Sequence, residues 1–402
     1  MTAVLAGIFG LENLQTIEDV VQDTFIAAHQ SWRYGRLPEN PPAWLMQTAK
    51  NKAINLLRRE KKMRFPEETP EESAPPGFEH LFLEHEIRDS SLRLLFALCH
   101  PDFPERSRLL LTLKYFCGFG NEEIGNALLM QPEAVKKALL RLRAEIRDKR
   151  IPFRVPFITR SLERLRTVNR VLYLMFNEGY KTTRQEEDIN HELCFESVRL
   201  AQLLEDIAGN PEGTAETCAL LALMHFSIAR FPARTNEQGE IVLLVEQDRS
   251  RWDRRFVAQG YRYLERSREA KQVSRYHLEA GIAALHCSAP DLPSTDWAKI
   301  VFYYERLAAI DPSPAVLISR ALALGYLEGP AKGIDALLLQ ESDEAFERNF
   351  LYHAALGDLY ARNGNADKAA PHYRRAQTLT RSQRCKHLLE QKLARLDQVK
   401  PV

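Results

Sequence analysis

Helical periodicity constrains this chain more than any other feature of its sequence. Apolar residues recur at the three- and four-residue intervals of an α-helix along nearly the whole length, whereas alternating strand patterns bounded by hairpin turns are scarce. One apolar run at 240–245 (EIVLLV) is compatible with a short strand or with the start of a buried helix. The pattern predicts an all-α fold.

Length and composition narrow the class of protein. A chain of 402 residues exceeds one ordinary hydrophobic core, so two to four domains are expected. No apolar run approaches the roughly 20 residues that cross a bilayer, and the opening MTAVLAGIFG lacks the basic flank of a signal peptide. We therefore expect a cytoplasmic protein without membrane association. The six widely spaced cysteines favour reduced thiols over a metal site or disulfides.

Charge is unevenly distributed although the net charge is only +1. Residues 50–64 hold seven basic residues against Glu60, and residues 136–150 hold seven against Glu145 and Asp148. Residues 65–90 between them hold eight acidic residues and one basic residue. Two local basic patches on a nearly neutral chain are typical of limited contact with nucleic-acid phosphates.

The segment 17–32 predicts an acidic amphipathic helix. Its predicted buried stripe follows helical spacing and comprises Ile17, Val20, Val21, Thr24, Phe25 and Ala28. Its outer face carries Glu18, Asp19, Gln22 and Asp23. A solvated acidic face near a helix N-terminus is the simpler interpretation, and contact with a basic partner is the alternative.

A second helix is expected after Pro41–Pro42, a pair suited to a first helical turn. Its predicted inner side holds Leu45, Ala49, Ala53 and Leu56. The candidate DNA contacts on another face are Asn51, Asn55, Arg58 and Arg59, since asparagine pairs with adenine and arginine with guanine or phosphate. The aromatic side chains that could stack on unpaired bases are Trp32, Tyr34 and Trp44. Core packing is the alternative, and we favour it for Trp44.

Residues 121–147 have the pattern of a helix-turn-helix. Asn121 is a good N-cap and Pro132 opens the second helix, whose predicted buried stripe is Val135, Leu139, Leu142 and Ile146. Ile124, Leu128 and Met130 are expected to pack inward. The candidate base readers are Glu133, Lys136 and Lys137, and the candidate phosphate contacts are Arg141 and Arg143. A generic helical hairpin is the alternative.

A repeat signal follows from about residue 275. In residues 351–380, the small and aromatic positions have the spacing of a tetratricopeptide repeat: Leu356, Gly357, Tyr360, Ala369, Tyr373 and Ala376.

The order of these segments resembles an extracytoplasmic-function sigma factor of the sigma-70 family. The motifs CHP at 99–101, NEGY at 177–180 and EQDRSRWD at 246–253 are similar to the subgroup with a long C-terminal helical extension ending in tetratricopeptide-like repeats. The resemblance implies that the acidic helix binds core RNA polymerase and that the second helix reads the minus-ten promoter element. Relatives have more helix before the position where this chain begins, so either the start is misassigned or the first domain is shortened.

The predicted domains follow from these patterns. They are a region-two domain at 1–64, an acidic flexible linker at 65–90, a helix-turn-helix domain at 91–150, a helical middle domain at 151–275 and tetratricopeptide-like repeats at 276–402.

The extension carries polar residues but no catalytic motif, and we expect neither enzyme activity nor a cofactor. Ion pairs joining helices are the simpler interpretation of its charged motifs. A regulatory site for a protein or small ligand is the alternative, with candidates Glu178, Tyr180, Arg234, Asp248, Arg249 and Trp252. The expected partners of Glu178, Glu246 and Asp248 are the nearby arginines Arg234, Arg249 and Arg251.

Two functions remain open from the sequence. The first is a sigma factor that binds core RNA polymerase and promoter DNA under control of its own extension. The second is a one-component transcription regulator with a repeat domain for effectors. An acidic docking helix favours the first.

Overall fold

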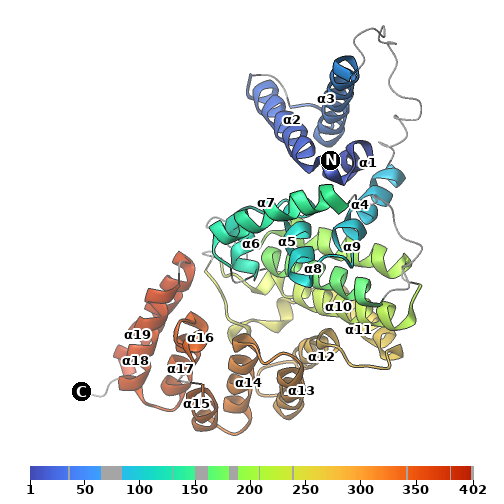
Figure 1. Cartoon of the computed structure of the whole chain (residues 1–402). Coiled ribbons are helices and arrows are strands. Elements are labelled where there is room, and N and C mark those ends of the chain that lie inside the picture. The colour runs from blue at the N-terminus through green and yellow to red at the C-terminus, as the bar shows by residue number, and fades with distance from the viewer. Residues whose placement is uncertain are drawn as a thin grey trace. The chain divides into compact units, whose positions relative to one another are not determined.

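The fold is all-α, as the periodicity predicts (Figure 1). The computed structural model describes residues 1–34, 37–64, 84–128, 130–149, 162–180, 189–207, 209–237, 240–340, 343–380 and 382–399. Among these residues the only strand-like pairing is an isolated bridge between Thr235 and Ile241. The run at 240–245 therefore forms neither a regular strand nor a helix, apart from the short turn η4 (Leu244–Glu246).

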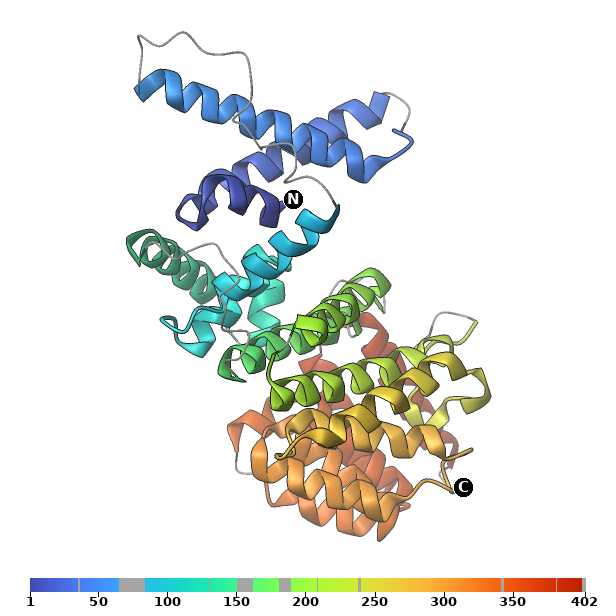
Figure 2. The same cartoon turned by 90° about the vertical axis from the view of Figure 1, so that its right-hand side faces the viewer.

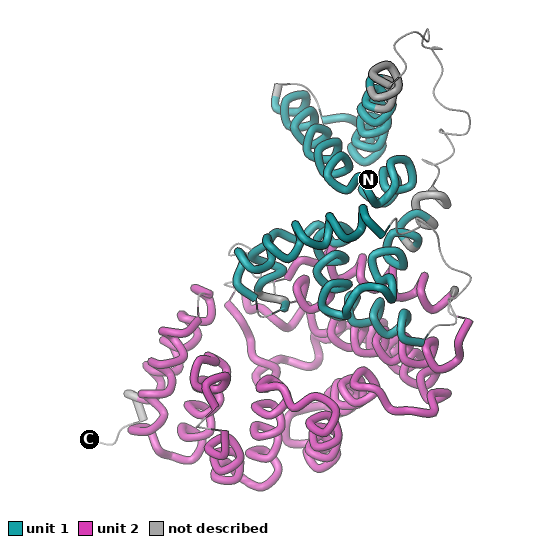
Figure 3. Tube along the Cα trace, viewed as in Figure 1, with its two compact units in different colours: residues 1–175 teal, residues 176–402 magenta. Residues whose placement is uncertain are grey.

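The chain divides into two compact units, residues 1–175 and 176–402 (Figure 3). The boundary falls inside helix α8 (Leu162–Tyr180). Residues 65–83 of the predicted linker, and the predicted domain boundary at 150–151, lie outside the described residues. Residues 84–90 were also predicted as linker and instead form the first turns of α4.

Unit 1 contains the first seven α-helices and most of α8. Its elements are α1 (Thr2–Phe9), η1 (Leu11–Asn13), α2 (Leu14–Tyr34), α3 (Pro41–Arg64), α4 (Glu84–Leu98), α5 (Glu105–Tyr115), α6 (Asn121–Leu128) and α7 (Pro132–Lys149). Helix α2 packs beside α3, α1 packs against α4, and α7 packs against η1. The core includes Leu5, Ile17, Leu95, Leu111 and Ile124.

Unit 2 is a succession of helices in which each packs mainly on its neighbours (Figure 2). Its first elements are α9 (His191–Ile207), α10 (Pro211–Ala229), η3 (Phe231–Ala233), η5 (Arg249–Arg251), α11 (Arg254–Arg266), η6 (Ser267–Glu269) and α12 (Arg275–Ser288). They are followed by α13 (Trp297–Ile310), α14 (Pro314–Leu327), α15 (Pro330–Leu338), α16 (Glu344–Glu347), α17 (Phe350–Arg362), α18 (Ala366–Leu379) and α19 (Gln383–Val399).

Close packing of α17 on α18 explains the small residue at position 357. A Cβ built on Gly357 would lie 2.6 Å from the ring of Tyr373, so only glycine lets the two helices approach this closely. Leu356, Ala369, Tyr373 and Ala376 are buried in the same core, together with Tyr352.

The last helix of unit 2 is tied to a segment far earlier in the chain. The Glu240 carboxylate accepts hydrogen bonds from Gln391 at 2.8 Å and pairs with His387 at 3.0 Å, both on α19. Glu246 lies 3.5 Å from Arg395 on the same helix. The segment before α11 and the final helix are therefore held together by polar contacts.

Candidate functional site

The acidic face of α2 forms largely as its sequence predicts. Ile17, Val20 and Ala28 are buried, and Thr24 turns its hydroxyl back to the Val20 carbonyl at 2.7 Å, which satisfies this polar group within the core. The outward side carries Asp19, Gln22 and Asp23, all exposed. These three side chains are accessible to a basic partner.

Phe25 was predicted to be buried and is instead 53% exposed. Successive side chains of a helix point about 100° apart around its axis. Phe25 therefore points about 100° away from the buried Thr24, at the margin of the buried stripe. Ile26, at 54% exposure, follows Asp19, Gln22 and Asp23 at helical spacing. The prediction was wrong because the buried stripe is narrower, and the acidic face ends in exposed apolar side chains.

Helix α3 buries Ala49 and Ala53 and exposes the opposite side. Asn51, Asn55 and Arg59 are exposed there, and Gln47 donates to the Asn51 side chain at 3.2 Å. The side chain of Arg58 lies outside the described residues. Three of the four predicted contacts on this helix therefore share an accessible surface.

The two tryptophans of this region pack on each other. The ring centroids of Trp32 on α2 and Trp44 on α3 are 5.5 Å apart, and both residues are half-buried. Packing thus accounts for Trp44 as favoured above, and it involves Trp32 equally. The side chain of Tyr34 lies outside the described residues.

Helices α6 and α7 are joined by a tight turn that depends on Gly125. A Cβ at this position would lie 2.6 Å from the Met130 carbonyl oxygen, and the Met130 amide donates to the Gly125 carbonyl at 2.7 Å. Ile124 is fully buried, while Leu128 and Met130 are half-buried. The Gly125–Met130 contact therefore sets the direction of α7 relative to α6.

Helix α7 buries the predicted stripe and presents most of the predicted contacts. Val135, Leu139, Leu142 and Ile146 are buried. The exposed side chains at its N-terminal half are Glu133, Lys136, Lys137 and Arg141. One side of α7 can therefore approach DNA while the other remains in the core.

Arg143 differs from these exposed residues because it contacts α2 and α5. Its Nη1 donates to the Gln15 side chain at 2.6 Å, its Nη2 to the Glu18 carboxylate and its Nε to the Tyr115 hydroxyl. Lys114 lies 3.7 Å from the same carboxylate. Burial alone would lower the pKa of Arg143, but the Tyr115 hydrogen bond and the charges of Glu18 and Asp19 raise it above its ordinary value.

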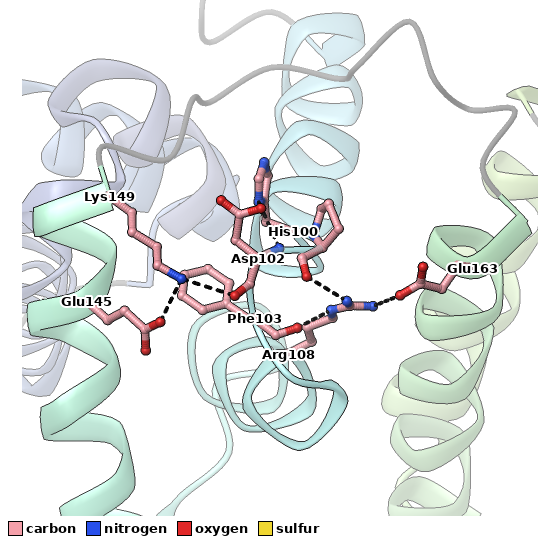
Figure 4. A network of polar contacts seen from close by, with 8 residues as sticks. His100, Asp102, Phe103, Arg108, Glu145, Lys149 and Glu163 are labelled. Carbon is pink, nitrogen blue, oxygen red and sulfur yellow. Dashed lines mark hydrogen bonds and ion pairs between the residues drawn. The ribbon is translucent and has the colours of Figure 1, made fainter.

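A second network in unit 1 surrounds Arg108, a residue absent from the predicted site (Figure 4). Arg108 is only 6% exposed. It donates to the carbonyls of Phe103 at 2.7 Å and Pro101 at 3.0 Å, to Glu163 at 2.8 Å and to Thr167 at 3.3 Å. One guanidinium thus joins the loop of the CHP motif to α5 and α8.

The C-terminal end of α7 reaches the same loop. Lys149 donates to the Asp102 carbonyl at 3.1 Å, pairs with Glu145 at 2.8 Å and lies over the Phe103 ring (Figure 4). An arginine within the apolar run of α5 was the available signal for this network, since a buried arginine needs several acceptors.

In unit 2 the NEGY motif contacts Arg234. The Arg234 guanidinium lies 3.9 Å from the Tyr180 ring centroid and donates to the Tyr180 carbonyl at 2.7 Å. The Tyr180 ring also packs against Phe231 of η3. Arg234 therefore contacts both the ring and the carbonyl oxygen of Tyr180.

The EQDRSRWD motif also lies against η3, which its turn η5 contacts. Arg249 is 6% exposed and donates to the carbonyls of His286 and Ala289 and to the Thr295 hydroxyl, each at 3.0 Å. Arg249 and Arg230 both lie over the Trp252 ring, at 5.4 and 5.7 Å. The Asp248 side chain accepts a hydrogen bond from the Ser250 amide and so caps η5, and Glu246 pairs with Arg395. Hydrogen bonds from Ser250, and then the charge of Arg251, its predicted partner, lower the pKa of Asp248. Glu246 differs from the prediction, because the cation it pairs with is Arg395.

Neither a metal-binding cluster nor a membrane-spanning helix occurs in the part of the chain that the structure describes. No group of three or more histidine, cysteine, aspartate or glutamate side chains there is placed to hold a metal ion. No helix there is long and apolar enough to cross a membrane.

Comparison with known proteins assigns the first helices of the chain. Residues 3–63 match the family model described as sigma-70 region 2, which covers α1, α2 and α3. Residues 164–268 match a family of unknown function, DUF6596, and this range includes Tyr180, Arg234, Arg249 and Trp252. The chain is 32% identical over 378 residues to the uncharacterized protein R00370 of Rhizobium meliloti (strain 1021), covering 90% of this chain and 86% of that protein.

Proposed function

The chain belongs to the same family as the uncharacterized protein R00370 of Rhizobium meliloti and carries a sigma-70 region 2, and from this premise we propose that it is a sigma factor. It would be a non-catalytic cytoplasmic subunit of the extracytoplasmic-function type. It would bind core RNA polymerase, recognise a two-part promoter and help to open it.

The observation that carries the proposal is the match of residues 3–63 together with the surfaces of the helices in that range. Asp19, Gln22 and Asp23 expose an acidic face on α2, which suits docking on a basic surface. Asn51, Asn55 and Arg59 expose donors and acceptors on α3 for the minus-ten element. In this proposal α2 binds the polymerase and α3 binds the DNA.

The α6–α7 pair supports a second DNA contact as a helix-turn-helix domain. Its second helix opens at Pro132 and exposes Glu133, Lys136, Lys137 and Arg141 in the half that such proteins insert in the major groove. We assign the first three to base readout and Arg141 to phosphate contact, at the upstream promoter element.

Unit 2 is the proposed regulatory extension. The close α17–α18 packing at Gly357 supports a tetratricopeptide-like repeat, an architecture that binds other proteins. The Tyr180–Arg234 and Arg249–Trp252 clusters are the candidate regulatory residues, together with Glu178 and Asp248. Control by this extension would replace a separate inhibitor protein.

In vitro transcription tests the proposal directly. Purified core polymerase should initiate at specific promoters only when the full-length protein is added, with the same core preparation alone as the control. Binding of the protein to a specific DNA duplex without polymerase association would instead favour a one-component regulator. Absence of both activities would reject both functions.

A further inference from the structure

One salt-bridged cluster joins the predicted polymerase contact of α2 to the predicted phosphate contact of α7. Glu18 pairs with both Arg143 and Lys114, and Gln15 accepts a further hydrogen bond from Arg143. Each of the three guanidinium nitrogens of Arg143 donates to a partner inside the chain. The three charged side chains are 21–26% exposed, so the cluster is partly shielded from water.

Apolar packing supports the same arrangement at two further places. Helix α1 packs against α4, and η1, which precedes α2, packs against α7. Leu11 of η1 is almost completely buried. The region 2 segment and the α4–α7 segment thus belong to one compact unit in the free chain.

These contacts compete with the proposed function, on which this inference rests. Arg143 and Lys114 neutralise much of the Glu18 charge, so Glu18 attracts a basic polymerase surface less strongly while these ion pairs are formed. Arg143 likewise cannot donate hydrogen bonds to a DNA phosphate while its guanidinium donates to Gln15, Glu18 and Tyr115. We propose that this cluster is an intramolecular lock that keeps the free chain closed, and that polymerase docking on α2 opens it by replacing Arg143 and Lys114 as the partners of Glu18.

The expected strength of the lock is modest. A closed state lowers apparent affinity by the fraction of molecules that are open, and a partly exposed ion pair shifts such a balance by about two- to fivefold. Replacing Glu18's partners therefore weakens the closed state by a factor of this size, in addition to what the apolar packing contributes to it.

Zero-length carbodiimide cross-linking, read by mass spectrometry, reports the lock in the full-length protein. Because Glu18 and Lys114 lie 3.7 Å apart, an amide link between them should form in the free chain. The link should fall several-fold when saturating core polymerase is present. The Glu145–Lys149 pair, 2.8 Å apart within α7, is the matched internal control and should remain constant.

A double variant outside the proposed polymerase and DNA contacts gives an independent measurement. Gln15→Ala with Lys114→Gln should bind core polymerase about two- to fivefold more tightly, since each removes a contact of the closed state. Arg170→Gln, which removes an exposed pair with Glu105, is the control and should leave the affinity unchanged.

Each outcome decides the proposal. Absence of the Glu18–Lys114 link in the free chain, its persistence in the polymerase complex, or unchanged affinity of the double variant would overturn the lock alone. A full-length protein that never binds polymerase, yet shows the link, would overturn the proposed function and the opening step with it.

Discussion

Glu18 and Arg143, 125 positions apart in the chain, share a hydrogen-bonded ion pair. One lies on the helix whose acidic face suits a polymerase and the other on the helix whose basic face suits DNA. The pair therefore couples two surfaces that a sequence pattern can only describe separately.

Charge reversal on α2 should abolish polymerase association. Asp19→Lys with Asp23→Lys replaces two exposed carboxylates, so a basic partner surface should repel the variant. Co-purification with core polymerase measures the effect, and circular dichroism should show unchanged helix content. Glu122→Lys with Asp148→Lys makes the same change in net charge elsewhere in unit 1 and should retain binding. Equal binding by both double variants would contradict the docking assignment.

Alanine substitutions on α7 should separate base readout from phosphate contact. Lys136→Ala should cost about 1–3 kcal/mol at one base pair of the promoter, whereas Arg141→Ala should weaken all sequences alike and lower the salt slope by about one. Binding titrations on a panel of single-base promoter variants at several salt concentrations distinguish the two. Uniform weakening by Lys136→Ala would remove that residue from base readout.

Gly125→Ala should disrupt the turn between α6 and α7. The added methyl would meet the Met130 carbonyl oxygen at 2.6 Å, and a backbone clash of this kind costs about 1–3 kcal/mol. We expect a lower denaturation midpoint and weaker DNA binding. Gly120→Ala, where the nearest atom is 3.4 Å away in a flexible side chain, is the matched control. Equal stability of the two variants would show that the turn tolerates a side chain.

Removing Arg108 should destabilise unit 1. Arg108→Met leaves the buried Phe103 carbonyl and the partly buried Pro101 carbonyl without this donor, at a cost of about 1–3 kcal/mol. Arg170→Met removes an exposed pair and should change stability by less than about 1 kcal/mol. Denaturant titration measures the free energy of unfolding of both variants. A similar loss of stability in both would show that the buried network of Arg108 does not stabilise unit 1 more than an exposed ion pair does.

Acid should destabilise unit 2 through His286. Burial, with added repulsion from Arg230 and Arg249, lowers the pKa of His286 to about 3 from an ordinary value of 6.5. The unfolded chain therefore takes up a proton below about pH 6.5 that the folded chain refuses until about pH 3. Stability is full above that window and falls by up to about 1.4 kcal/mol per pH unit within it.

His286→Gln should flatten this acid limb relative to the native chain, as measured by unfolding midpoints between pH 7 and about pH 4. His29→Gln, which replaces an exposed histidine on α2, is the control. A native chain equally stable across this range would contradict the effect.

Local patterns predicted the elements of this fold well. Apolar spacing predicted the all-α class, and Pro132 begins α7 as its preference for the first helical turn indicates. Asn121 was predicted as the N-cap of α6 and is instead its first helical residue, since the Gly120 carbonyl accepts the first helical hydrogen bond. The buried side of α7 also follows its stripe. These features depend on neighbours within a few residues, so they can be read from a single sequence.

Contacts between distant segments were not predictable in the same way. Nothing in the spacing around Arg143 shows that Glu18 and Tyr115 will surround it, and nothing around Arg249 shows that its acceptors are backbone carbonyls. The periodicity around Phe25 gave its angular position but not the width of the surface that covers α2. Such questions are decided by the partner segment.

The contact of Glu240 with His387 and Gln391 has a consequence for how this chain can change over evolution. Solenoid proteins commonly gain or lose whole repeats, because each repeat touches only its neighbours. Here residues 147 and 151 positions apart are joined, so every helix between them contributes to the span of a closed loop. An inserted or deleted helical pair would separate the two ends, whereas substitutions within the helices would not. Unit 2 should therefore vary in sequence among relatives far more readily than in its number of helices.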